Sequence, residues 1–95
     1  MDYDKLKEIE EFANGIGFRA IVADFGYATF GVRTDNFIIE VVYDVARKEY
    51  LSEQVYVSTS SMNTDDMDVL KGFKSYVEKA IVIADKLKET KVNGV

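Results

Sequence analysis

The stretch from Phe37 to Asp44 constrains the fold most, because it is the longest run of β-branched and aromatic residues in the chain. Residues of these types favour strands, where their side chains pack well on a pleated surface. Large apolar side chains alternate onto both faces of the stretch, a pattern typical of a strand with neighbours on each side. The run therefore predicts the central strand of a sheet.

Three further segments predict strands that pair with one another in chain order. They cover residues 18–23, 27–34 and 50–58. Asp24-Phe25-Gly26 fits a three-residue hairpin loop with Gly26 in the left-handed conformation. Asp35-Asn36 fits a two-residue loop whose residues tolerate positive φ. We therefore expect a four-stranded antiparallel meander.

The loop lengths fix how the predicted strands pair. The expected pairs are Ala20 with Phe30, Phe30 with Val41 and Val32 with Ile39. For the last strand, a pairing of Tyr43 with Leu51 would place Ile39 opposite Val55. One sheet face is then apolar except for Glu53. An inward-facing charge on an edge strand discourages pairing between sheets. A bulge near Ser52 is the alternative, since it would turn the carboxylate out of the core.

Amphipathic helices are predicted at both ends of the chain. Residues 3–14 repeat apolar side chains at helical spacing, and Asn14-Gly15 favours the left-handed conformation that ends helices. A longer helix is expected to begin with Thr64 as its N-cap and to reach Thr90. Its stretch Ala80–Ala84 is apolar nearly all round. This pattern indicates burial on more than one side, against the first helix or against a second subunit.

These elements predict a single small α+β domain over residues 1–95, with both helices packed on one sheet face. Residues 91–95 are expected to form a flexible tail. No apolar run is long enough for a transmembrane helix, and the acidic start of the chain is followed by no signal-peptide core. We therefore expect a cytoplasmic protein that does not contact membranes.

The composition removes most catalytic chemistry. The chain has no histidine, cysteine or tryptophan, which excludes the commonest general base, the commonest zinc ligands and the familiar Cys and Ser-His nucleophiles. Asp65, Asp66 and Asp68 fit a helix start, where acids are favoured, better than a metal site. We expect no catalytic residue, metal or cofactor. A carboxylate pair such as Glu40 with Asp44 is the weaker, enzymatic alternative.

The second face of the predicted sheet is the first candidate site. It mixes aromatic, aliphatic and charged side chains and stays exposed if both helices cover the apolar face, which makes it a candidate protein interface. Alternatively, its tyrosines are cross-strand partners on a solvated sheet. The candidate partner-binding residues on this face are Tyr27, Tyr50, Tyr56, Arg19 and Arg33.

Acidic residues form the second candidate site. A net charge of −5 disfavours direct binding to nucleic acid, which needs a basic footprint. Carboxylates can instead mimic nucleic acid and engage the basic groove of a nucleic-acid-binding protein. The candidate acids are Asp4, Glu8, Glu11, Asp24 and Asp35.

The sequence thus predicts a small acidic protein-interaction module, not an enzyme. We expect it to bind and to regulate or inhibit a protein partner, with mimicry of nucleic acid as the more specific version of that role. The alternative is a homo-oligomeric structural protein, for example a homodimer.

Overall fold

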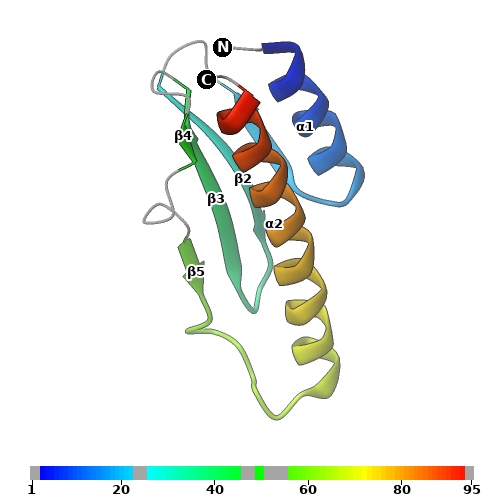
Figure 1. Cartoon of the computed structure of the whole chain (residues 1–95). Coiled ribbons are helices and arrows are strands. Elements are labelled where there is room, and N and C mark those ends of the chain that lie inside the picture. Colours follow the sequence, from blue (N-terminus) through cyan, green and yellow to red (C-terminus); the bar gives the residue numbers. More distant parts are fainter. Residues whose placement is uncertain (1–2, 23–25, 46–48, 51–55, 94–95) are drawn as a thin grey trace.

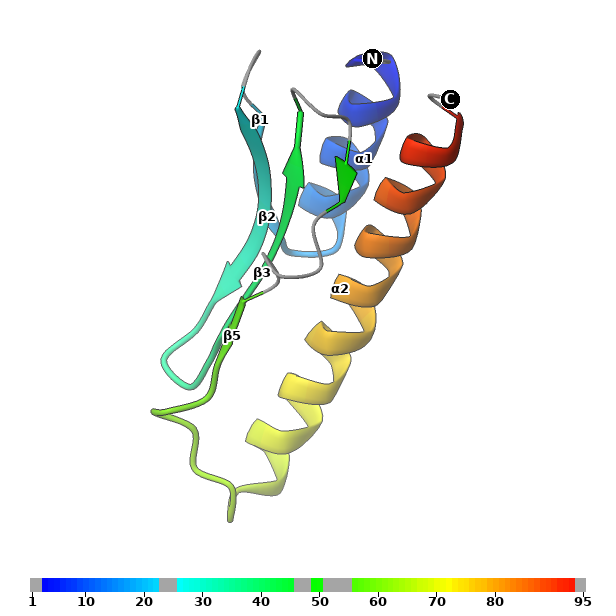
Figure 2. The ribbon, with the colours of Figure 1, turned by 60° about the vertical axis from the view of Figure 1, so that its left-hand side comes forward.

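A computed structural model describes residues 3–22, 26–45, 49–50 and 56–93 and shows a two-layer α+β fold (Figure 1). The elements are α1 (Tyr3–Gly15), β1 (Arg19–Val22), β2 (Tyr27–Arg33), β3 (Ile38–Asp44), β4 (Glu49–Tyr50), β5 (Tyr56–Ser58) and α2 (Met67–Asn93). Both helices lie on the same face of the antiparallel sheet (Figure 2). The predicted fold class is therefore confirmed.

The central position of β3 is also confirmed. β2 pairs with one edge of β3, and both β4 and β5 pair with the other edge. The predicted pairs that are observed are Ala20–Phe30, Phe30–Val41 and Val32–Ile39. The register predicted for the first three strands is therefore confirmed over the described residues, whereas Asp24 and Phe25 of the predicted hairpin loop lie outside them.

The turn between β2 and β3 holds the register in place. The N–H of Thr34 donates to the carbonyl oxygen of Phe37 at 2.9 Å, which leaves Asp35 and Asn36 as the predicted two-residue loop. The Thr34 hydroxyl oxygen accepts the N–H groups of Asn36 and Phe37, each at 3.1 Å. One side chain thus satisfies two backbone donors of the turn.

The predicted register of the last strand is wrong. The observed pairs are Tyr43–Tyr50 and Ile39–Val57, in place of Tyr43–Leu51 and Ile39–Val55. Along β3 the two pairs are four residues apart, from 43 to 39. Along the segment that pairs with β3 they are seven residues apart, from 50 to 57. A continuous antiparallel strand needs equal spacings, so two short strands with different registers form this edge. The inward Glu53 and the bulge near Ser52 were predicted for residues outside the described ranges.

The core lies between the sheet and the helices. Its largest fully buried side chains are Tyr43, Phe30, Leu6, Ile39, Ile83, Leu87 and Val41. Ile83, inside the apolar stretch Ala80–Ala84 of α2, is fully buried, and the ammonium of Lys86, three residues later, lies 4.7 Å from the centre of the Phe12 ring of α1. Helix α1 therefore supplies a second buried side for α2, while Ile81 and Val82 remain exposed.

Helix α1 ends in a Schellman motif that is centred later than predicted. The N–H of Phe18 donates to the carbonyl of Ala13 at 2.9 Å, and the N–H of Gly17 donates to the carbonyl of Asn14 at 3.3 Å. Gly17, with φ of 92°, takes the left-handed conformation rather than Gly15. The motif places Phe18 and Ala13 together in the core.

Asp66, not the predicted Thr64, caps α2. Its carboxylate accepts the N–H groups of Asp68 at 3.0 Å and Val69 at 3.4 Å, which is the N-cap pattern. The helix starts at Met67, so Thr64 lies too early to reach these donors. Across the described ranges, no group of three or more metal-ligating side chains could hold an ion.

Helix α2 continues to Asn93, three residues into the predicted tail. Neither α1 nor α2, over the residues that the structure describes, has an apolar stretch long enough to cross a bilayer.

Gly17→Ala should destabilise the protein by about 1–2 kcal/mol, because a left-handed conformation strains a residue with a Cβ. Gly15→Ala is the matched control, since Gly15 lies in the helix with nothing within 4 Å of an added Cβ. Alanine should there stabilise the helix by up to about 1 kcal/mol. Urea unfolding of both variants checks the motif, and equal free energies of unfolding would contradict it.

Phe30→Ala should lower the free energy of unfolding by about 3–5 kcal/mol, because it leaves a cavity in the core. Ile81→Ala on the exposed surface of α2 should change it little, since Ile81 is 54% exposed. A Phe30→Ala loss as small as that of Ile81→Ala would show that the β2 register is off by one residue.

Candidate functional site

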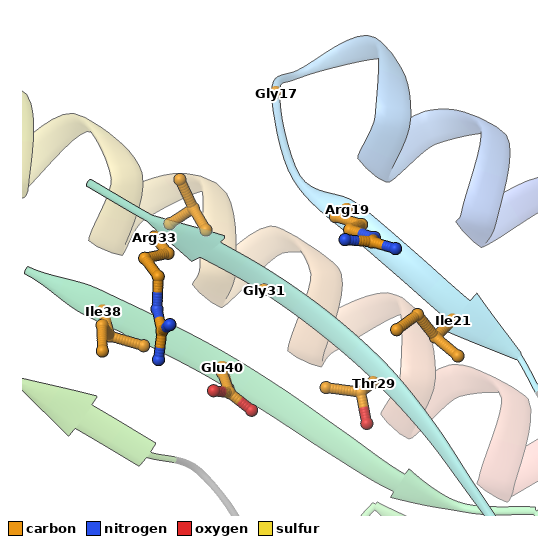
Figure 3. A pocket seen from close by; sticks show the side chains of 9 residues that line it. Gly17, Arg19, Ile21, Thr29, Gly31, Arg33, Ile38 and Glu40 are labelled. Atoms are coloured by element: carbon orange, nitrogen blue, oxygen red, sulfur yellow. The ribbon is translucent and has the colours of Figure 1, made fainter.

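The sheet face opposite the helices, here called the outer face, carries an open hollow of about 480 Å³ (Figure 3). Its lining includes Arg19 and Ile21 of β1, Thr29, Gly31 and Arg33 of β2, and Ile38 and Glu40 of β3. The structure thus brings two of the predicted binding residues, Arg19 and Arg33, to one depression.

One row of residues across the sheet explains why the hollow exists. Arg19 pairs with Gly31, Gly31 pairs with Glu40, and Glu40 pairs with Tyr56. Paired residues point to the same face, so the row should present four side chains outward. Gly31 contributes none, and its backbone forms the floor between Arg19 and Glu40.

The hollow carries two guanidinium groups and one carboxylate. Arg19 and Arg33 are exposed, and Glu40 is half-buried. In Figure 3 the Arg33 side chain runs from β2 toward Ile38 and Glu40 on β3. None of these three charged groups forms an ion pair within the described part of the chain. The hollow is therefore a local positive site on a protein of net charge −5.

Two exposed aromatic side chains lie on the same sheet face as the hollow. Tyr27 on β2 is 53% exposed and Tyr56 on β5 is 52% exposed. The third predicted tyrosine, Tyr50, is paired in the backbone register with the core residue Tyr43, not with a residue of the outer face. Of the predicted tyrosines, Tyr27 and Tyr56 are the two whose exposed side chains the structure describes on this surface.

The predicted acidic residues do not form one patch. Asp4, Glu8 and Glu11 are exposed along α1, whereas Asp35 is exposed in the β2–β3 turn at the other end of the fold (Figure 1). Asp24 lies outside the described residues. Glu8 also shares a small groove with lysines of both helices, so that the acidic side of α1 is mixed in charge.

The carboxylate pair considered for catalysis is not assembled. Glu40 and Asp44 are both on β3, and four residues along a strand correspond to about 13 Å. Asp44 is also buried, with 6% of its surface exposed. The two groups therefore cannot act on the same bond from these positions.

The pKa of Tyr43 is raised above its ordinary value of 10.0, because burial disfavours the charged phenolate and the Asp44 carboxylate repels it. Shifted pKa values often mark functional sites when the group lines a cleft. Tyr43 is fully buried in the core, on the face opposite the hollow. Its shift therefore reflects packing.

No known protein family, curated protein or solved structure matches the chain. The geometry of the outer face is therefore the basis for functional inference.

The sequence predicted the charged and aromatic residues of this face but not the hollow. The sequence feature that indicates the hollow is Gly31, a glycine at the centre of a strand whose other residues favour β structure.

Proposed function

We propose that the protein is a non-enzymatic interaction module that binds a protein partner through its outer face and thereby regulates or inhibits that partner. The observation that carries this proposal is the sheet face that neither helix covers (Figure 2). On it, Ile21 is 57% exposed, and Tyr27 and Tyr56 are about as exposed. Exposed apolar and aromatic groups around a depression are characteristic of protein-binding surfaces.

The basic residues of the sheet favour the interpretation of the outer face as a protein interface rather than as a surface exposed only to solvent. β1, β2 and β3 contain Arg19 and Arg33 but no lysine, although lysines outnumber arginines in the chain. Protein interfaces are enriched in tyrosine and arginine and depleted of lysine. The planar guanidinium also binds carboxylates with two parallel hydrogen bonds, which the lysine ammonium cannot do.

The acidic side of α1 is the second candidate contact surface. Asp4, Glu8 and Glu11 are exposed at spacings of four and three residues, which aligns them on one side of the helix. Such a row would attract the basic groove of a nucleic-acid-binding protein, and the resulting complex would weaken as salt rises.

Tyr56→Ala and Tyr27→Ala should each weaken partner binding and leave the fold intact, because both side chains are exposed anchors. Tagged wild type and variants are used as bait in extracts of the source cell, and the bound proteins are quantified by mass spectrometry. Circular dichroism and melting temperature establish that the variants fold.

Light scattering of the purified protein tests self-association, since a dimer would have twice the 10.8 kDa monomer mass.

The Glu8→Lys, Glu11→Lys double variant separates the two surfaces. It should retain a partner held by the outer face and lose a partner held by the acidic side of α1. Retention of the partner by both tyrosine variants, together with its loss in the charge-reversal variant, would contradict the proposal.

A further inference from the structure

We propose that the hollow over Gly31 is a socket for one acidic side chain of the partner, held between Arg19 and Arg33. This inference rests on the proposed function and specifies the chemistry that the outer face recognises. The occupant is an aspartate or glutamate in a segment of the partner whose neighbouring residues are apolar.

The backbone conformation at position 31 does not require glycine. The described glycines with left-handed φ are Gly17 and Gly26, whereas Gly31 lies inside β2 in ordinary strand conformation. A Cβ added at Gly31 would lie 3.2 Å from Cγ of Glu40 and 3.4 Å from the carbonyl oxygen of Ile39, so the Glu40 side chain would have to shift by a few tenths of an ångström to admit it. Glycine weakens a strand interior, and it is found where a ligand or another chain approaches closely.

Two arginines lie beside the backbone of Gly31. Arg19 is the cross-strand neighbour of Gly31, and Arg33 is the next residue of β2 on the same face. The two cations flank one space and no ion pair within the described ranges neutralises either of them. A carboxylate placed over Gly31 can accept charge-assisted hydrogen bonds from both, which are among the strongest that proteins form.

Part of the rim of the hollow is apolar. Ile21 and Ile38 lie beside the hollow, where they can pack against the methylene groups of the acidic side chain and its apolar neighbours. Two arginines at a single hollow are too few for the basic footprint of nucleic-acid binding on a chain of net charge −5. The rim and the charge together favour a protein segment over a phosphate backbone.

Three variants test the socket by changing its space, its positive charge and its negative charge separately. Gly31→Val fills the hollow with a residue that strands favour. The double variant Arg19→Gln, Arg33→Gln removes the cations and keeps polar side chains of similar length. Glu40→Gln removes the one carboxylate of the hollow, which repels an acidic occupant, so its effect should have the opposite sign.

The probe is a library of random peptides displayed on phage and selected on the immobilised full chain. Peptides that bind should carry Asp or Glu at one fixed position beside apolar residues. Their affinities for wild type and variants are then measured by interferometry. Gly31→Val and the double arginine variant should each weaken peptide binding at least about tenfold. Replacement of the peptide's acidic residue by its amide should weaken binding to the same extent. Glu40→Gln should strengthen binding.

Several results would overturn the inference. These are a selection that enriches no peptide, peptides without a fixed acidic position, and equal binding to wild type and to the double arginine variant. A single-stranded oligonucleotide that binds wild type more tightly than the selected peptides would assign the arginines to nucleic acid instead. If the cellular partner is lost by Tyr56→Ala but retained by Gly31→Val and by the double arginine variant, the socket is wrong while the outer-face proposal stands.

Discussion

The antiparallel ladder between β2 and β3 is the constraint on which the rest of the structure depends. It joins seven residue pairs, from Tyr27–Asp44 to Arg33–Ile38, and the Thr34 turn closes it. Because side chains alternate between faces, a slip of one residue would move Phe30 to the outer face and bring Thr29 and Arg33 into the core. The ladder therefore determines both the core and the surface that is available to a partner.

Both helices are used to cover one of these two faces. Contacts between aromatic rings hold α2 against the sheet, with ring centroids 5.3 Å apart for Phe37–Phe73 and 5.8 Å apart for Phe18–Tyr76. Helix α1 packs beside α2 on the same side. Within the described ranges, neither α1 nor α2 covers the apolar groups of the outer face, and the missing side chain of Gly31 adds a hollow to it. Burial of such a surface favours association with another molecule.

Sequence reasoning succeeded where loops were short and failed where they were long. Two- and three-residue hairpin loops restrict the register, so the pairs through Phe30 were predicted correctly. The connection after Asp44 is longer and allows several registers, so the predicted partners of Tyr43 and Ile39 were wrong. Thr64 and Asp66 are both good N-cap residues, and only the observed hydrogen bonds distinguish them. The hollow was missed because it arises from three strands together, and no local pattern describes the space above a glycine.

We propose that the partner binds to the outer face rather than to the helical face. Hydroxyl-radical footprinting of the free and the partner-bound protein tests it most directly, because it reports the solvent access of individual side chains. The exposed Tyr27 and Tyr56 should lose reactivity in the complex, while Met67 at the start of α2, which is 62% exposed, should keep it. Unchanged tyrosines together with a protected Met67 would place the partner on the helical side and contradict the account.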